Sequence, residues 1–160
     1  MLFPSLRAMC RLISFGFFVF PVLLAAGSAA QAVYAPNSSP VGRWKTVDDH
    51  TGKVKSIVEI HEENGRLYGT IEILFDPPVP HPTCYLCRGP KKDQALVGLQ
   101  VLWGFQRNGN QWSGGQILDP ENGRTYRASL ALEDGGKKLR VHGYIGVSLL
   151  GRTEHWIRAD

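Results

Sequence analysis

The C-terminal part of the chain constrains the fold most, because its residues alternate with a period of two. Between Leu139 and Ile145, small or apolar side chains are separated by polar or aromatic ones. A short turn then leads into a second run that ends at Trp156-Ile157-Arg158. This alternation is typical of half-buried antiparallel strands. A last strand this rich in apolar residues needs a neighbour, and pairing with the first strand would remove the exposed edge.

The same alternation recurs upstream and predicts six further strands. Short turns rich in Gly, Asn and Asp separate them, and Glu63-Asn64-Gly65 carries the strongest hairpin signal. We expect these strands over 42–46, 53–61, 66–75, about 96–105, 111–118 and 124–132, with a bulge or tight bend at Gly114-Gly115. No segment shows an apolar period of 3.6. The prediction is therefore all-β, an eight-stranded up-and-down antiparallel barrel.

One connection is much longer than the others. Residues 77–93 include four prolines between positions 77 and 82 and continue through Cys84-Tyr85-Leu86-Cys87, which excludes a central strand. Long loops on a rigid scaffold often carry function. We expect this segment to act as a lid over one end of the barrel.

The first 32 residues have the organisation of a secretory signal peptide. Arg7 and Arg11 precede an apolar run over 12–24, and Ala30-Gln31-Ala32 offers a cleavage site. The run is too short for a comfortable membrane span, so we expect none after cleavage. We predict a flexible lead over 33–40, a barrel domain over 41–160, and export to the periplasm or the extracellular space.

Charge argues against nucleic acid as a partner. The net charge of the chain is +4, and removal of two arginines with no acidic residue lowers it to +2. The remaining Lys and Arg residues are scattered and form no basic stripe. We therefore expect no nucleic-acid binding. The sequence makes no prediction of the oligomeric state.

The Cys84-x-x-Cys87 motif has three interpretations. An oxidising compartment favours a structural disulfide within the proline-rich loop. A redox-active pair would usually lie at a helix N-terminus, and nothing near Cys84 predicts a helix. Zinc could use His81 with the two cysteines, but a structural site needs a fourth ligand, and His50 and His61 lie strands away. The disulfide is our prediction, with neither metal nor cofactor.

The sequence contains no recognisable catalytic constellation. Gly114-Gly115 and Gly135-Gly136 do not precede helices, so they are not phosphate loops. Ser148 has no histidine at a spacing that would define a nucleophile–base pair. We predict that the protein is not an enzyme.

The strongest functional signal is a set of apolar side chains that alternation directs into the barrel. The set comprises Ile71, Ile73, Phe75, Val101, Trp103, Phe105 and Tyr126. Eight strands leave an interior that is either filled by side chains or holds one small ligand. Two hypotheses follow. In the first, these residues bind a small hydrophobic ligand, such as a fatty acid or other lipid. In the second, they fill a solid barrel of a non-catalytic envelope protein that acts through its loops.

Two motifs at the ends of the domain resemble the lipocalin and calycin pattern. Gly42-x-Trp44 lies in the first predicted strand, and Arg158 lies in the last. The resemblance implies that the arginine covers the indole and plugs one barrel end, a cation–π contact worth about 0.5–2 kcal/mol.

The chain resembles more closely a family of secreted bacterial proteins of unknown function with a lipocalin-like fold. The matching motifs include Trp112-x-Gly-Gly-x-Ile-Leu-Asp-Pro120, Asn122-Gly-x-x-Tyr126 and Gly143-Tyr-Ile-Gly-x-Ser-Leu-Leu-Gly-Arg152. With those around Trp44, 51–60, 67–71 and the cysteines, they cover nearly all of the predicted domain. The resemblance implies a lipocalin-like barrel, an exported protein and a small apolar ligand. It implies no established activity.

Overall fold

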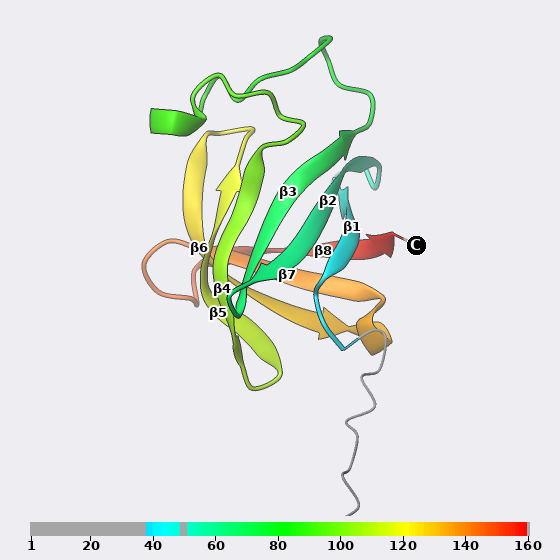
Figure 1. The fold of residues 1–160 in the computed structure, drawn as a ribbon, viewed down its shortest axis with the longest axis vertical. Coiled ribbons are helices and arrows are strands. Elements are labelled where there is room, and N and C mark those ends of the chain that lie inside the picture. Colours follow the sequence, from blue (N-terminus) through cyan, green and yellow to red (C-terminus); the bar gives the residue numbers. More distant parts are fainter. Residues whose placement is uncertain (1–37, 49–50, 160) are drawn as a thin grey trace, which may run out of the picture. The chain divides into compact units, whose positions relative to one another are not determined.

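In a computed structural model of the chain, the structure describes residues 38–48 and 51–159. These residues form a closed antiparallel barrel whose eight strands follow one another in sequence order (Figure 1). The strands are β1 (Gly42–Val47), β2 (Val54–Glu63), β3 (Arg66–Leu74), β4 (Gln100–Asn108), β5 (Gln111–Asp119), β6 (Arg124–Glu133), β7 (Lys138–Tyr144) and β8 (Gly151–Ala159). This confirms the predicted fold class.

The barrel closes between its first and last strands. β1 pairs with β8 in a register that places Trp44 opposite Arg158, while β2 lies on the other side of β1. Two 3-10 helices lie in connections, η1 (Gly89–Lys91) and η2 (Asp134–Gly136). Within the described residues no helix is long and apolar enough to cross a membrane. The predicted signal peptide lies outside the described residues.

One end of the barrel interior is filled by side chains. Trp44, Phe105, Leu130 and Leu139 are fully buried there, and Trp112 is almost so. Gly115 faces this packing, because a Cβ at that position would overlap the Phe105 ring. The pairing of β5 with β6 shifts register between Trp112 and Gly115, which confirms the predicted bulge at the two glycines. We call this the plugged end.

A β-bulge in β3 corrects part of the predicted interior. Ile71 pairs with Val58 and Ile73 pairs with Ile57, so Glu72 has no opposite residue. An extra residue reverses which face each later side chain occupies. Leu74 therefore packs against the core, whereas Phe75 is 43% exposed. The prediction that Ile73 and Phe75 face inward is wrong for this reason.

The alternation of β4 is interrupted in the same way. Its pairing with β3 shifts register twice, which leaves Val101 and Gly104 as extra residues. Gly104 has a φ of +82°, a conformation that glycine adopts without strain. Val101 and Phe105 are buried, but Trp103 pairs with Tyr68 and lies on the outer side, contrary to the prediction. β4 also begins at Gln100 rather than near residue 96.

Candidate functional site

The other end of the barrel opens into a cavity of about 490 Å³. Its lining includes residues of all eight strands, and many of them are apolar. The apolar lining includes Val58 of β2, Ile71 of β3, Val101 of β4, Ile117 of β5, Val141 of β7 and Trp156 of β8. The volume falls within the range of sites that enclose one small molecule. The barrel is therefore packed at one end and hollow at the other.

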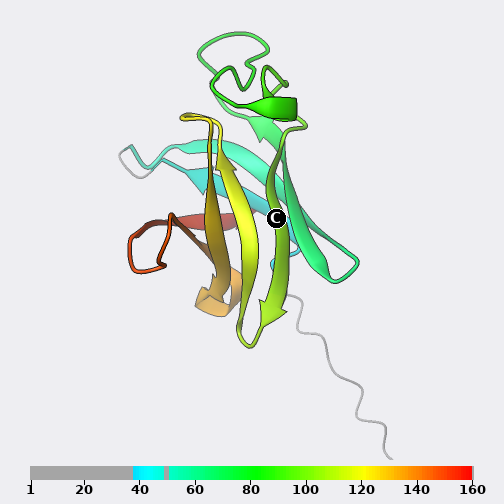
Figure 2. The same ribbon diagram turned by 90° about the vertical axis from the view of Figure 1, so that its left-hand side faces the viewer.

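Four connections form the rim of this cavity, which we call the mouth. They are the β1–β2 turn with Asp48, the β3–β4 loop with Leu96, the β5–β6 hairpin with residues 119–122, and the β7–β8 loop with Ile145 and Leu150. Figure 2 shows these segments from the side, with the long β3–β4 loop above the β5–β6 hairpin. A ligand would pass between these connections.

β8 places two charged side chains on the wall of the cavity. Arg152 and Glu154 alternate with outward residues and therefore share a face with Trp156 and Arg158. The Glu154 carboxylate lies 3.6 Å from the Arg152 guanidinium and accepts a hydrogen bond of 3.1 Å from the Trp156 indole. The cavity wall thus carries an ion pair and a hydrogen-bonded carboxylate next to its apolar side chains.

A second group of charges lies at the mouth. The Lys55 ammonium forms an ion pair with Glu121 across the opening, and it is 4.0 Å from a carboxylate oxygen of Asp48. The Asp119 carboxylate accepts hydrogen bonds from the Glu121 backbone and the Asn122 amide, which holds the hairpin turn. The cavity lining therefore carries four carboxylates, on residues 48, 119, 121 and 154, and two cationic side chains, Lys55 and Arg152.

Three of the predicted interior residues line the cavity, namely Ile71, Val101 and Tyr126. The Tyr126 hydroxyl accepts a hydrogen bond of 3.0 Å from the Asn122 amide, which ties the wall to the mouth. Phe105 is buried deeper, in the packed half. Ile73, Phe75 and Trp103 do not line the cavity.

The prediction from the sequence did not include the charged residues that β8 contributes to the cavity wall. Arg152, Glu154 and Trp156 lie at every second position before Arg158, the residue identified as the plug. That spacing was the available signal. Charged side chains in phase with an inward tryptophan indicate a barrel interior that is partly polar.

At the plugged end, the two residues that the calycin resemblance indicated are in contact. The Arg158 guanidinium lies 4.2 Å from the centre of the Trp44 ring. It also donates hydrogen bonds to the carbonyl oxygens of Gly136 at 2.7 Å, Ser39 at 2.9 Å and Val41 at 3.2 Å. Partial burial lowers the pKa of this guanidinium. One side chain thus joins β8 to the N-terminal segment and η2.

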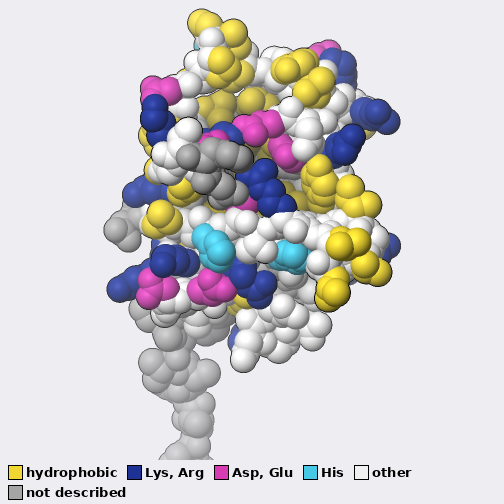
Figure 3. All heavy atoms as spheres, turned by 180° about the vertical axis from the view of Figure 1, so that it is seen from behind, with side chains coloured by type: hydrophobic (Ala, Val, Ile, Leu, Met, Phe, Trp, Pro, Cys, Tyr) yellow, Lys and Arg dark blue, Asp and Glu magenta, His cyan; other side chains and the backbone are white. Residues whose placement is uncertain are grey.

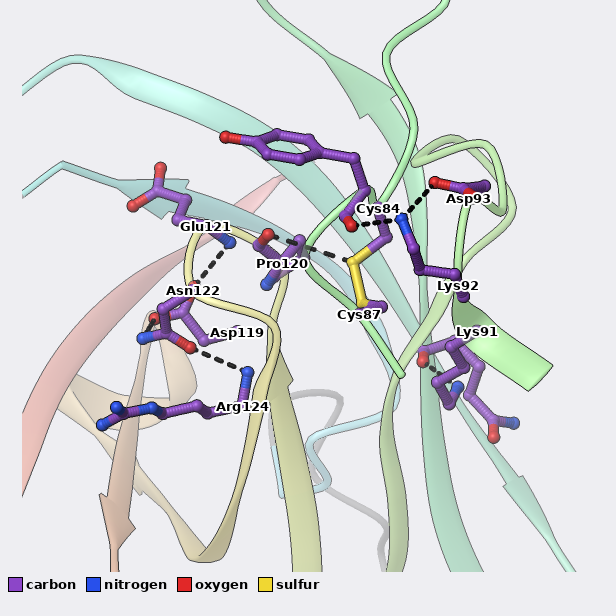
Figure 4. The surroundings of a disulfide bond; sticks show 12 residues. Cys84, Cys87, Lys91, Lys92, Asp93, Asp119, Pro120, Glu121, Asn122 and Arg124 are labelled. Carbon is purple, nitrogen blue, oxygen red and sulfur yellow. Dashed lines mark hydrogen bonds and ion pairs between the residues drawn. A yellow bond between two sulfur atoms is a disulfide. The ribbon is translucent and has the colours of Figure 1, made fainter. Parts of the chain in front are cut away.

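The β3–β4 loop is fastened to the mouth by buried contacts. Cys84 and Cys87 form a disulfide, as predicted, and both are buried. The Cys84 sulfur is 3.9 Å from the Pro120 carbonyl oxygen in the β5–β6 hairpin (Figure 4). In the same hairpin, Gly123 lies so close to the Leu86 carbonyl that a Cβ would overlap it. That the loop acts as a lid stays a prediction.

Lys91 of η1 fastens the other side of this loop to β4. Its ammonium donates a hydrogen bond of 2.6 Å to the Gln100 carbonyl and lies 4.9 Å from the centre of the Trp103 ring. Partial burial in this position lowers the Lys91 pKa. Trp103 therefore supports the long loop from outside the barrel.

The described residues contain no group of three or more His, Cys, Asp or Glu side chains that could hold a metal ion. His81 is exposed, and the two cysteines nearest to it in sequence are bonded to each other. The sulfur atoms are therefore not available as thiolate ligands.

Comparison with known proteins agrees with this architecture. Residues 42–158 match the model of a family described as "Uncharacterized protein conserved in bacteria (DUF2147)". Among solved structures, the chain is similar to protein HP1028 from the human pathogen Helicobacter pylori, which is described as belonging to the lipocalin family. The TM-score is 0.66 and the identity 22%, over 76% of this chain and 84% of that chain. No curated protein sequence matches the chain. The family and lipocalin-like fold indicated by the sequence motifs are confirmed.

Proposed function

The chain belongs to this DUF2147 family of bacterial proteins, and from that premise we propose that it binds one small amphipathic lipid without catalysis. The observation that carries the proposal is the cavity of about 490 Å³ with apolar depths and a charged mouth. An acyl chain would contact Val58, Ile71 and Trp156. A polar head group would lie near Arg152 and Glu154. Burial of apolar ligand surface would supply most of the binding free energy.

The charges at the mouth favour a neutral or zwitterionic head group over a fatty-acid anion. Lys55 and Arg152 already have acidic partners in Glu121 and Glu154. A ligand carboxylate would have to displace one of these partners and would face the remaining carboxylates of the lining. A monoacyl glycerol or a lysophospholipid avoids this repulsion.

The competing hypothesis of a solid barrel requires side chains throughout the interior. The packed half of this barrel fits that description, but the cavity beside the mouth does not. The Cys84–Cys87 disulfide is compatible with an oxidising compartment. We therefore place the binding protein, as part of the same proposal, outside the cytoplasm.

Displacement of a neutral fluorescent probe, N-phenyl-1-naphthylamine, tests the binding proposal. The probe should bind in the cavity and be displaced by monolauroylglycerol or lauroyl lysophosphatidylcholine. Dodecanoate, which has the same chain length, should need a roughly tenfold higher concentration because of the acidic mouth. Equal displacement by all three would contradict the head-group assignment and leave the cavity assignment intact.

Gly143 offers a matched pair of variants for the cavity itself. It lines the cavity, and a Cβ there would be 3.5 Å from Ile117 and 3.7 Å from Tyr126, which are ordinary contacts. Gly143→Ala should therefore bind the probe, whereas Gly143→Phe should fill the cavity and abolish binding. Circular dichroism and thermal unfolding would establish that both variants are folded. Wild-type binding by a folded Gly143→Phe would overturn the proposal.

A further inference from the structure

The β7–β8 loop, residues 145–150, presents an unusual number of aliphatic side chains to solvent. Ile145 is 63% exposed, Val147 64%, Leu149 93% and Leu150 73%. The loop contains no charged residue. Scattered apolar side chains on a protein surface are ordinary, but a contiguous group on one loop marks a surface that contacts something apolar.

Hydrogen bonds fix the loop in the conformation that exposes these side chains. The His142 ring on β7 is 2.8 Å from the Ser148 carbonyl oxygen through Nε2 and 2.8 Å from the Thr153 hydroxyl through Nδ1. Because a carbonyl only accepts, Nε2 donates to Ser148. The Leu150 backbone N–H donates to the Val147 carbonyl at 3.2 Å, which closes a turn. These contacts hold the loop in a turn while its aliphatic side chains stay exposed.

Two arginines of β6, the strand paired with β7, lie near this apolar loop. Arg127 of β6 is exposed and is the register partner of Tyr144, the last residue before the loop. Arg124, at the start of β6, is also exposed, and no described carboxylate forms an ion pair with either arginine. In Figure 3, hydrophobic side chains gather at the right, over the β7–β8 loop, with Lys and Arg side chains above them.

We infer that the β7–β8 loop docks the open end of the barrel onto the surface of an anionic lipid bilayer. Val147 and Leu149 would enter the boundary between head groups and acyl chains, while Arg124 and Arg127 would contact lipid phosphates. Ile145 and Leu150 of the same loop line the mouth. Docking would thus bring the mouth next to the bilayer. The carboxylates on residues 48, 119, 121 and 154 line the cavity, so they act on a head group inside it. The bilayer contact is assigned to Val147, Leu149 and the two arginines, none of which lines the cavity.

Charge favours a bilayer over a second copy of the chain. A symmetric dimer through this face would bring the arginines of one copy toward those of the other, and like charges at an interface are destabilising. A bilayer that contains phosphatidylglycerol offers both the apolar interior and the negative charge that this surface lacks.

Vesicle flotation tests the inference. Full-length protein is mixed with vesicles of phosphatidylethanolamine and phosphatidylglycerol, or with vesicles of phosphatidylcholine alone. The wild type should float with the anionic vesicles, less with the neutral ones, and less again at high salt. The variant V147S/L149S should lower the partition coefficient by about a hundredfold, and R124Q/R127Q by about tenfold or more. All variants keep residues 1–37, so any vesicle binding by those residues contributes equally to every variant.

Two variants at the plugged end serve as controls, because they remove the same kinds of side chain as the variants at the mouth. Ile157→Thr removes an aliphatic side chain that is 44% exposed, and Lys137→Gln removes an exposed cation. Neither should change flotation. Val147 and Leu149 do not line the cavity, so V147S/L149S should still bind the neutral probe, which separates loss of docking from loss of ligand binding. Unchanged flotation of V147S/L149S would overturn the inference. So would a dimer in sedimentation that only this variant abolishes, because it would assign the loop to a second copy.

Discussion

At the scale of single residues, Arg158 shows how one side chain can join three parts of a barrel. Its guanidinium lies over Trp44 and donates to backbone carbonyls of the N-terminal segment and of η2. Trp44 donates its own indole hydrogen to the Pro40 carbonyl at 2.7 Å. The planar fork of arginine can make all of these contacts at once, and a lysine ammonium cannot.

Arg158→Lys should therefore destabilise the barrel although it keeps the charge. We expect the free energy of unfolding in urea to fall by about 1–3 kcal/mol, since several charged hydrogen bonds and most of the cation–π contact are lost. Arg124→Lys, at an exposed position without an ion pair among the described residues, should change it by less than about 0.5 kcal/mol. Equal stability of the two variants would contradict the plug assignment.

At the scale of elements, the number and order of the strands could be predicted because each turn has its own local chemistry. Asn64-Gly65, for example, supplies two consecutive residues with positive φ for the β2–β3 hairpin. Gly114 and Gly104 likewise permit bulges through their positive φ, but only the first was identified. The bulge at Glu72 has no such residue, because an ordinary side chain occupies it. The faces of Ile73 and Phe75 could not be predicted for that reason.

The cavity was harder to predict than the strands. Whether an eight-stranded barrel is filled depends on the summed volume of inward side chains, which the strand pattern does not give. Gly143 contributes no side chain to the cavity wall, and Arg152 and Glu154 bring charge into it. These three residues follow the inward period of β7 and β8. They were not predicted because the inward set was chosen for its apolar side chains, whereas Gly143 has no side chain and the other two residues are charged.

The contact between the β3–β4 loop and the β5–β6 hairpin gives a prediction at the same scale. Gly123→Ala should destabilise the fold more than Gly65→Ala, although both glycines have positive φ, +66° and +73°. At Gly65 no atom lies within 4 Å of the added Cβ, so only backbone strain of about 1 kcal/mol is expected. At Gly123 the Cβ would overlap the Leu86 carbonyl, which adds at least about 2 kcal/mol.

Urea unfolding of the two alanine variants measures this difference. Gly123→Ala should also detach the β3–β4 loop, so the Cys84–Cys87 disulfide should react faster with a reducing agent than in Gly65→Ala. Identical midpoints and identical rates of reduction would mean that the loop does not depend on the hairpin.

At the scale of the whole barrel, stability and binding are separated along its axis. The plugged end contains the fully buried Trp44, Phe105, Leu130 and Leu139, whereas the mouth contains the charges and the exposed β7–β8 loop and leads into the cavity. A packed end can hold the strands in place while the other end accepts a ligand. This division is why filling the cavity at Gly143 should abolish binding without unfolding the barrel.

A native mass spectrum tests the central claim most directly. The protein would be purified from the cell without detergent or refolding, as wild type, Gly143→Ala and Gly143→Phe. We predict additional mass of a few hundred daltons, typical of one lipid in a cavity of this size, on the wild type and Gly143→Ala. Gly143→Phe should appear as bare polypeptide. Bare polypeptide in all three, or the same additional mass on the folded Gly143→Phe variant, would contradict the account.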